Sequence, residues 1–287
     1  KYNIVFHTIF CMGTENFEPY YMGRLVVVEG GNPFFFNVVL SREAVRALGI
    51  IEEVARVFRE ENVPILLFKA SVPPSGVDGD VRIIVSADLK DEKQAERIAQ
   101  KLRRIRYVSR VEYAKPIMPG VGVDAWSHPQ MLHSDRALVL SKIYLKEILA
   151  FGWGGIGPGF AGLMYRAFFE AGRKIYDELY EKLVRTREDF IKLLEARARL
   201  LGWGVLEVVE LTEDKAVFRV YDNIECMSLK GIEGAENALL RGLLAGILSG
   251  YWKTDVYHIK PAETKCIARG DPYCQLEYRK EKYEPLV

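Results

Sequence analysis

The sequence predicts an α+β protein of two domains, and three observations lead to that class. The chain has 287 residues, enough for two domains of about 100–200 residues each. Its first part alternates short apolar runs with amphipathic segments, whereas its second part starts with long helical segments and ends in paired strands. Hydrophobic residues make up 49% of the chain and charged residues 28%, a balance that is typical of folded rather than disordered proteins.

The chain begins with segments of strand character. Apolar residues alternate at 2–10, and RLVVVE at 24–29 forms a second run, with the loop CMGTENFEPYYMG between them. GGN then interrupts the pattern. PFFFNVVLS at 33–41 is a continuous apolar run, which predicts a buried strand.

Two amphipathic helices and three further strands follow as far as residue 117. The first helix carries its apolar residues on one stripe with charges opposite, and the turn PSGVDGD separates the next two strands. The stripe consists of Val45, Leu48, Ile51, Val54, Ala55 and Phe58. The segments are a helix over 42–63, strands at 64–73 and 81–89, a helix over 92–105 and a strand at 109–117. With the strand at 33–41 the order is β-α-β-β-α-β, the ferredoxin-like pattern.

Residues 33–116 also resemble the ACT domain, a small regulatory module that often binds amino acids at an interface between copies. In that family a short acidic-Pro-Gly loop after the first strand holds the ligand, and the matching loop here is Ser41–Gly49. Only Gly49 fits the motif, since the Asp and the Pro are absent. An amino-acid site and a purely structural or dimerising sandwich therefore remain the two alternatives.

A proline-rich segment separates this part from the rest of the chain. KPIMPGVGVDAWSHPQML, at 115–132, holds three prolines and two glycines and has little periodicity. We therefore expect an ACT-like domain with N-terminal strands at 1–118, a linker at 119–134 and a second domain at 135–287. His128 and His133 lie in or beside the linker, where a solvated or capping role is the plain interpretation.

The second domain is predicted to start with helices. Asp135 suits the N-cap of a helix that ends near Gly154, and a long amphipathic helix then runs to about Leu201. The glycines between 154 and 162 match neither a Walker loop nor a dinucleotide-binding loop. They indicate close helix packing instead.

Strands and a glycine-striped helix complete the domain. Strands are expected at 203–211 and 215–223, then a helix over 231–252 and strands at 254–266 and 273–281. Three glycines recur at intervals of four in that helix, and they form a smooth stripe on which another element can pack closely. The glycines are Gly242, Gly246 and Gly250.

The stretch ETKCIARGDPYC, at 263–274, brings a carboxylate and two thiols close to one turn. Cys266 ends one strand and Cys274 begins the next, so the two sulfurs should lie together. Glu263 is three residues before Cys266, which places the two side chains on opposite faces of a regular strand. A bulge or a strand end is needed before both can bind one ion. A metal site, a Cys266–Cys274 disulfide and free thiols are the alternatives.

This terminal part resembles the 4-vinyl reductase domain, also called the hydrocarbon-binding family. Glu263, Cys266, Gly270 and Cys274 match its terminal motif, and RGLLAGILSG at 241–250 matches the preceding helix, so that the resemblance covers about 135–280. It implies an apolar ligand pocket between helices and sheet. It also implies a structural zinc ion held by the Glu, these two Cys and one further Cys.

The sequence departs from the family at that further ligand. The neighbourhood where the family carries it reads Ala238-Leu239-Leu240, without a ligand. Cys226 is the candidate replacement. Zinc in a closed structural site prefers four protein ligands, so the set to test is Glu263, Cys266, Cys274 and Cys226.

The pocket walls implied by the resemblance would be aromatic side chains of the long helices and of the sheet. The candidates are Trp153, Tyr165, Phe168, Phe169, Phe218 and Tyr221. Tyr165 or Tyr221 could supply a polar group. The alternative is that all six only pack in the core.

These observations predict a non-catalytic, regulatory protein that binds or senses an apolar, aromatic or lipid-like molecule. No nucleophile elbow, zinc-protease motif or nucleotide fingerprint stands out. The alternatives are a reductase or accessory enzyme for a tetrapyrrole-like or hydrocarbon substrate, and a dimeric scaffold.

Charge and hydropathy add further expectations. Basic and acidic residues nearly cancel, at 40 and 39, so direct nucleic-acid binding is not expected. No apolar run reaches the roughly 18–20 residues of a membrane span, and a cytoplasmic location is expected. Both resembled families pair, which predicts a homodimer. The Lys-, Glu- and Arg-rich helices hint at a thermophilic source.

Overall fold

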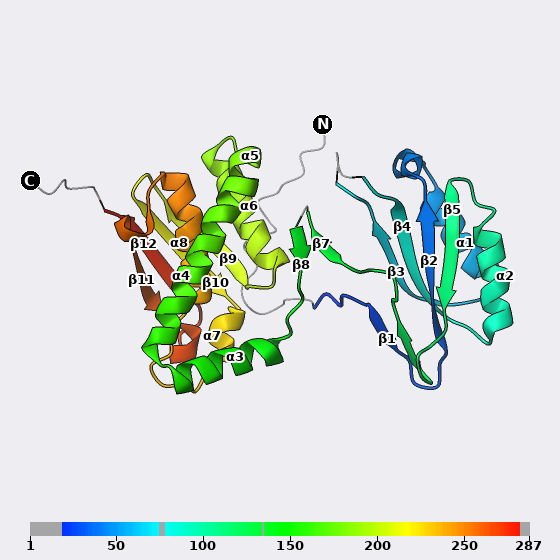
Figure 1. Cartoon of the computed structure of the whole chain (residues 1–287), viewed down its shortest axis with the longest axis horizontal. Helices are drawn as coiled ribbons and strands as arrows, with labels where there is room; N and C mark the ends of the chain where they lie inside the picture. The colour runs from blue at the N-terminus through cyan, green and yellow to red at the C-terminus, as the bar shows by residue number, and fades with distance from the viewer. Residues whose placement is uncertain (1–18, 75–77, 134, 282–287) are drawn as a thin grey trace, which may run out of the picture. The chain divides into compact units, whose positions relative to one another are not determined.

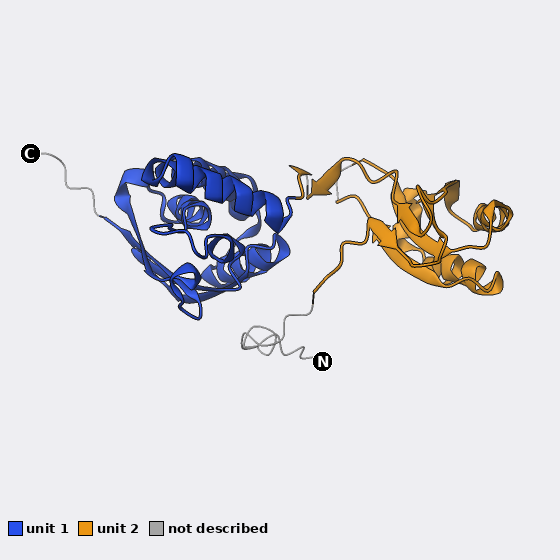
Figure 2. Ribbon diagram, turned by 90° about the horizontal axis from the view of Figure 1, so that it is seen from below, with its two compact units in different colours: residues 1–18, 140–287 blue, residues 19–139 orange. Residues whose placement is uncertain are grey.

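The computed structural model describes residues 19–74, 78–133 and 135–281 (Figure 1). These residues divide into two compact units, an N-terminal unit at 19–139 and a C-terminal unit at 140–281 (Figure 2). The strand expected at 2–10 lies outside the described residues. None of the helices in the described ranges combines the length and the apolar character that a membrane crossing requires.

The N-terminal unit is a four-stranded antiparallel sheet with two helices, and the predicted β-α-β-β-α-β order is confirmed. The strand order in the sheet is β3-β4-β2-β5. Its elements are β2 (Pro33–Leu40), α1 (Ile50–Glu60), β3 (Ile65–Ser71), β4 (Val81–Asp88), α2 (Glu92–Leu102) and β5 (Val108–Ala114). The first helix starts later than expected because Gly49 adopts a left-handed φ of +83°, which interrupts it after a short 3₁₀ turn at Arg42–Arg46.

Strand β2 is buried on both faces, which explains its continuous apolar run. Phe36 and alternate residues of β2 pack with Phe58 of α1 and Ile98 of α2 in one core. Phe35 faces the other way, where Gly122 lies so close that an added methyl group would meet its ring. The second face is therefore covered by the chain around Gly122.

Part of the segment expected to be a linker, 119–134, has regular structure. β6 (Val121–Val123) pairs with β1 (Leu25–Val27), and β7 (Gln130–Leu132) pairs with β8 (Asp135–Ala137). The low periodicity of the segment reflects very short strands rather than an open chain. The domain boundaries themselves stay predictions.

The helix expected to start at Asp135 starts instead at Lys142. Asp135 belongs to β8, after a turn in which His133 has a φ of +58°, and Ser141 precedes α3 (Lys142–Gly155). An Asp is compatible with both a helix cap and a turn, and here strand pairing decides between them.

The C-terminal unit packs helices against a second four-stranded antiparallel sheet. Its strand order is β11-β12-β10-β9. The strands are β9 (Val205–Leu211), β10 (Lys215–Tyr221), β11 (Ile259–Lys265) and β12 (Cys274–Lys280). Helix α8 (Leu239–Trp252) is buried along almost its whole length, and it contacts β11 and β12 on one side and α4 (Pro158–Ile175) on the other. The central position of α8 explains why nearly all its residues are apolar.

The glycine stripe of α8 is in direct backbone contact with α4, as predicted. A methyl group at Gly242 would meet the carbonyl of Tyr165, and one at Gly246 would meet the carbonyl of Phe169. Gly172 of α4 closes the same contact from the other side, against the carbonyl of Leu243. The absence of side chains is therefore what allows these two helices to lie so close.

The long helix expected to reach Leu201 is interrupted. A π-helical turn at Tyr176–Tyr180 and the short α5 (Glu181–Leu183) follow α4, and Val184 is extended. Thr186 then caps α6 (Arg187–Leu200), because its hydroxyl accepts the Asp189 amide at 3.1 Å and the Asp189 carboxylate accepts the Thr186 amide at 2.9 Å. This reciprocal pair is a capping box, and the sequence TRED at 186–189 has the residue spacing that such a box requires.

Two further boundaries differ from the prediction. Helix α8 begins at Leu239 rather than at 231, because Gly231 and Gly234 have φ values of +83° and +71°, which no helix accepts. Strand β11 begins at Ile259 because the Asp255 carboxylate accepts the Tyr257 amide at 2.9 Å and starts a short 3₁₀ turn.

Candidate metal site and ligand cavity

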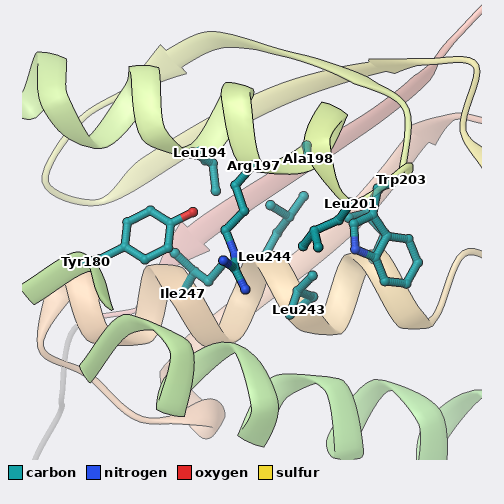
Figure 3. A pocket seen from close by; sticks show the side chains of 10 residues that line it. Tyr180, Leu194, Arg197, Ala198, Leu201, Trp203, Leu243, Leu244 and Ile247 are labelled. Atoms are coloured by element: carbon teal, nitrogen blue, oxygen red, sulfur yellow. The ribbon is translucent and has the colours of Figure 1, made fainter. Parts of the chain in front are cut away.

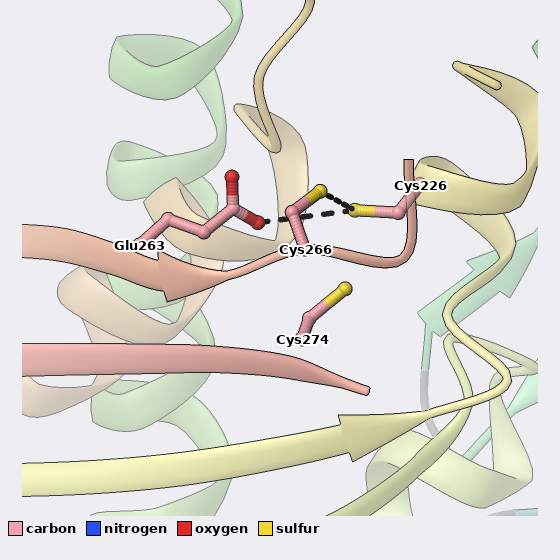
Figure 4. A group of neighbouring side chains, drawn as sticks. All are labelled: Cys226, Glu263, Cys266 and Cys274. Atoms are coloured by element: carbon pink, nitrogen blue, oxygen red, sulfur yellow. Dashed lines mark hydrogen bonds between the residues drawn. The ribbon is translucent and has the colours of Figure 1, made fainter. Parts of the chain in front are cut away.

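Three thiols and one carboxylate meet at one end of the C-terminal sheet (Figure 4). The Sγ atoms of Cys226 and Cys266 lie 3.5 Å apart, and the Sγ of Cys226 lies 3.9 Å from an oxygen of Glu263. With the Sγ of Cys274, all four ligand atoms lie within 4.8 Å of one another. We call these four residues the thiol cluster.

A bulge brings Glu263 and Cys266 to the same side. The register of β11 against β12 shifts between Glu263 and Lys265, so one extra residue enters the strand. Cys266 lies just beyond the end of β11. The bulge and the strand end therefore allow Glu263 and Cys266, three residues apart, to face the same point.

The turn between the two thiols is held by its own hydrogen bonds. The Cys266 amide donates to the Asp271 carboxylate at 2.8 Å, and the Asp271 amide donates to the Cys266 carbonyl at 3.1 Å. Gly270 adopts a φ of +97°, which a glycine accepts without strain. The Ile267 amide lies 3.5 Å from the Sγ of Cys274 and donates to it. The turn is thus preformed around the sulfurs.

Cys226 reaches the thiol cluster from α7 (Ile224–Ser228), the short helix after β10. Asn223 caps α7 by accepting the amides of Glu225 and Cys226 at 3.0 and 3.4 Å. The fully buried carboxylate of Glu225 accepts three amides at the start of α8, at 2.7, 2.9 and 2.9 Å. The donors are Ala238, Leu239 and Leu240. Helix α7 therefore joins the thiol cluster to the beginning of α8.

The close approach of the sulfurs changes their ionisation. Hydrogen bonds from the neighbouring thiols lower the pKa of Cys266, and the same contact with Cys266 raises the pKa of Cys226. Burial, together with the charge of Cys266, raises the pKa of Glu263 to about 8. A bound cation would favour the deprotonated form of all four ligands.

The geometry fits a small tetrahedral metal ion. Sulfurs that share a tetrahedral zinc at about 2.3 Å lie roughly 3.8 Å from one another, close to the 3.5 Å between Cys226 and Cys266. All three Cys are buried, and the Glu263 side chain is 3% exposed. One Glu263 oxygen makes no hydrogen bond within the described residues, although the guanidinium of Arg269 lies 3.7 Å away. The thiol cluster could hold a metal ion.

The predicted pocket residues do not form one group. Phe218 is fully buried in the core beneath α8, where Phe169 also lies and against which Tyr165 and Phe168 pack. Trp153 lies in a smaller core of α3 and the start of α4. Burial raises the pKa of Tyr165, whose hydroxyl makes no hydrogen bond within the described residues.

Tyr221 lies on the other face of the sheet. Its neighbour Val220 is buried in the core, and the alternation of the strand turns Tyr221 outward. There its hydroxyl donates to the Glu207 carboxylate at 3.1 Å, and its ring contacts Tyr273. Tyr221 is thus separated by the sheet from the core residues of the predicted pocket.

An apolar cavity lies between α6 with the turn that follows it, α8, and the end of the π-helical turn at Tyr180 (Figure 3). It measures ≈ 20 Å³, counted as the volume open to the centre of a water molecule. Eight of its lining residues are apolar, and two are polar. The lining residues are Tyr180, Leu194, Arg197, Ala198, Leu201, Trp203, Leu240, Leu243, Leu244 and Ile247. None of the six predicted pocket residues is among them, although Phe168 packs edge-on against Trp203.

Sequence reasoning missed this cavity because it treated residues up to Leu201 as one continuous helix. A signal was present in the spacing of Leu194, Ala198 and Leu201, which share one face of α6. Arg197, between the first two on that face, is the residue that breaks its apolar pattern. A charged residue on a core-facing stripe is the clue that could have located the site.

Comparisons with known proteins agree with the terminal motif. Residues 216–280 match the family model of the 4-vinyl reductase domain, so this part of the predicted resemblance is confirmed. An uncharacterized protein of Methanocaldococcus jannaschii is 26% identical over 119 residues, which is 42% of this chain and 64% of the relative. The chain thus spans less than two thirds of the curated relative that it matches.

Solved structures of low identity are also similar. The phenol-responsive sensory domain of the transcription activator PoxR, with phenol, is 16% identical with a TM-score of 0.46, over 52% of this chain and 79% of that one. A vinyl-4-reductase family protein from Methanocaldococcus jannaschii is 16% identical with a TM-score of 0.35, over 51% of this chain and 85% of that one.

Proposed function

We propose that this protein binds an apolar small molecule in its C-terminal unit and acts as a non-catalytic, regulatory sensor. The observation that carries the proposal is the apolar cavity between α8 and α6 with the turn that follows α6. It lies in the unit that contains the 4-vinyl reductase match, and its walls are aliphatic and aromatic, as small-molecule sites usually are.

Ligand binding on this proposal selects a more open arrangement of the unit. The cavity admits about one water molecule, so a guest must separate α6 from α8. Helix α6 is joined to α5 by non-helical residues at 184–186, and it ends near Leu201, which is 39% exposed. A ligand that binds only the open arrangement would shift the population toward it, and that shift is the signal.

We further propose that the thiol cluster holds a structural zinc ion. Three buried thiols and one carboxylate are a suitable closed donor set for zinc. The ion would tie the turn of β11 and β12 to α7, and through Glu225 to the start of α8. Its role is to hold one end of the cavity wall in place.

Native mass spectrometry of the freshly purified chain tests both parts. We expect one zinc ion per chain and a co-purified apolar molecule that leaves on mild activation. A second sample, dialysed and titrated with apolar probes, should show saturable binding by calorimetry. A chain that carries no guest and binds no apolar probe would contradict the sensor, whatever its zinc content.

A scaffold is the second candidate, and the small size of the cavity favours it. The apolar cavity beside α8 has a volume of only ≈ 20 Å³. A scaffold should keep the same stability when apolar probes are added, whereas a sensor should gain stability with ligand concentration. Thermal unfolding with and without probe separates the two.

The remaining sequence expectations stay predictions. The homodimer is tested by sedimentation at two protein concentrations. A role for Trp153, Tyr165, Phe168, Phe169, Phe218 or Tyr221 in the pocket is tested by whether a bound probe contacts them. Amino-acid binding at Ser41–Gly49 is tested by calorimetry with amino acids.

A further inference from the structure

Two polar groups at one end of the cavity make no hydrogen bond with the described part of the chain. Tyr180 is 0% exposed, yet its hydroxyl has no hydrogen-bond partner there. Burial raises the pKa of this hydroxyl, so it stays protonated and able to donate. An unpaired buried hydroxyl is destabilising, so a ligand that accepts its hydrogen bond would remove that penalty.

Arg197 is the second group, and it extends into the same cavity (Figure 3). Its side chain is half-buried and lies among Leu243, Leu244 and Ile247. No ion pair or side-chain hydrogen bond of Arg197 occurs within residues 19–74, 78–133 and 135–281. No anion of the described residues pairs with Arg197, and because none of its nitrogens is among the buried unpaired atoms, solvent reaches the guanidinium.

Two other charged groups of α6 have partners, one on the exposed face of the helix and one beside β9. Lys192 pairs with Glu188, with 2.6 Å between nitrogen and oxygen. Glu195 accepts the Val208 amide of β9 at 2.9 Å. Arg197 is thus unlike these neighbours, since it points a cation at an apolar space without an anion.

We infer that the cavity takes an organic acid, with its carboxylate paired to Arg197 and accepting a hydrogen bond from the Tyr180 hydroxyl. This inference rests on the proposed function and adds the chemical class of the ligand. A guanidinium fork matches a carboxylate through two parallel hydrogen bonds. The apolar body of the acid lies against the leucines and Ile247. A neutral hydrocarbon would leave both polar groups without partners, and the site would discriminate against it.

Matched pairs of probes test the inference on the full chain. 3-Phenylpropionate and 3-phenylpropan-1-ol form the aromatic pair, and octanoate and 1-octanol form the aliphatic pair. We expect the acid of at least one pair to bind tenfold or more tightly than its alcohol, and the pair that does so identifies the apolar body.

Variants assign the preference to its residues. Arg197→Met should weaken acid binding by about tenfold or more and leave the alcohol unchanged, because truncating one side of a buried charge pair acts on the charged partner. Arg197→Lys should keep part of the preference, and Tyr180→Phe should weaken the acid by a smaller factor. Arg199→Met, an exposed position on the same helix, is the control and should change neither affinity. Circular dichroism checks that each variant is folded.

The outcomes are distinguishable. Alcohols that bind as tightly as acids would overturn the organic-acid inference and keep the apolar-ligand proposal. Acid binding that survives Arg197→Met unchanged in a folded chain would also overturn the inference. If neither member of either pair binds, the proposed function fails as well.

Discussion

The thiol cluster and the cavity lie in the same unit but differ in how their polar atoms are satisfied. In the thiol cluster the ligand atoms face one another within 4.8 Å, and the backbone of the turn supports them. In the cavity, the buried Tyr180 hydroxyl has no described hydrogen-bond partner, and the half-buried Arg197 lines the same space without an anion beside it among the described residues. Each region keeps one buried oxygen without a hydrogen-bond partner within the described residues, Glu263 in the thiol cluster and Tyr180 in the cavity, but only in the thiol cluster do neighbouring donor atoms gather around one point.

Helix α8 connects the two regions. Its first amides are accepted by Glu225, beside Cys226, and its next turns supply Leu240, Leu243 and Leu244 to the cavity. Its glycines fix it against α4. We therefore expect a change in the thiol cluster to affect the cavity through the position of α8.

The largest expected effect on stability comes from disrupting the thiol cluster. Cys266→Ala, or removal of the metal by a strong chelator, should lower the free energy of unfolding by on the order of 4 kcal/mol or more, because loss of a structural metal belongs to the most destabilising changes. Urea unfolding followed by circular dichroism measures it.

The control for this change lies on the same strand. Thr264 is exposed, and Thr264→Ala should stay within about 0.5 kcal/mol of the natural chain. If chelator leaves the free energy of unfolding unchanged, no bound metal stabilises the thiol cluster. The cluster would then be ordinary packed side chains.

The next effect separates stability from binding. Leu244→Ala should lower the free energy of unfolding by about 3 kcal/mol, since Leu244 is 2% exposed. Because Leu244 lines the cavity, the same change enlarges the site, and the affinity for the acid probe should be retained or increased. Calorimetry and urea unfolding on the same preparations measure both.

Leu248→Ala is the matched control, one turn further along α8. Leu248 is 0% exposed and does not line the cavity. It should lose comparable stability without any gain in affinity. Equal affinities in the two variants, both below that of the natural chain, would argue that the cavity is not the binding site.

A smaller effect tests the connection between the regions. Glu225→Gln should lower the free energy of unfolding by about 2 kcal/mol, because an amide replaces a carboxylate that accepts three backbone amides. It should also weaken acid binding, since the start of α8 carries Leu240. Unfolding and calorimetry give the two values. Loss of stability with unchanged affinity would show that the thiol cluster and the cavity are independent.

The sequence predicted the thiol cluster better than the cavity, and the reason is physical. Cys266 and Cys274 flank one tight turn, and few residue types bind metals, so spacing and chemistry pointed to the same place. Cys226 was proposed without geometry, and only α7 brings its sulfur to 3.5 Å from Cys266. The order of elements in the N-terminal unit followed from periodicity, because burial and pattern agree there, whereas the pairing order within the two sheets comes from the structure.

The cavity could not be predicted in the same way. Tyr180 and Arg197 are ordinary residues in separate helical segments, and they meet only because the chain breaks at Val184. The aromatic candidates were chosen from the predicted long helix and from the sheet, and none of them lines this cavity, so their role in a pocket stays a prediction. Tyr221 lies on the opposite face of the sheet from Phe218, because side chains alternate along β10.

The smallest expected effect comes from comparing two buried hydroxyl groups, one with a hydrogen-bond partner and one without. Tyr180 and Tyr278 are both 0% exposed, but the Tyr278 hydroxyl donates to the Arg241 carbonyl at 3.0 Å while the Tyr180 hydroxyl has no described partner. Tyr278→Phe removes a made hydrogen bond and should lower the free energy of unfolding by about 1 kcal/mol. Tyr180→Phe removes an unpaired donor and should leave the stability of the ligand-free chain unchanged or raise it by up to about 1 kcal/mol.

Urea unfolding of the two variants, without ligand and then with saturating acid probe, measures the difference. With the probe bound, Tyr180→Phe should gain less stability from the ligand than the natural chain does, because its donor to the carboxylate is gone. Tyr278→Phe should gain as much as the natural chain. If Tyr180→Phe destabilises the ligand-free chain as much as Tyr278→Phe does, the Tyr180 hydroxyl already has a hydrogen-bond partner in the folded protein. It is then not available to donate a hydrogen bond to a ligand.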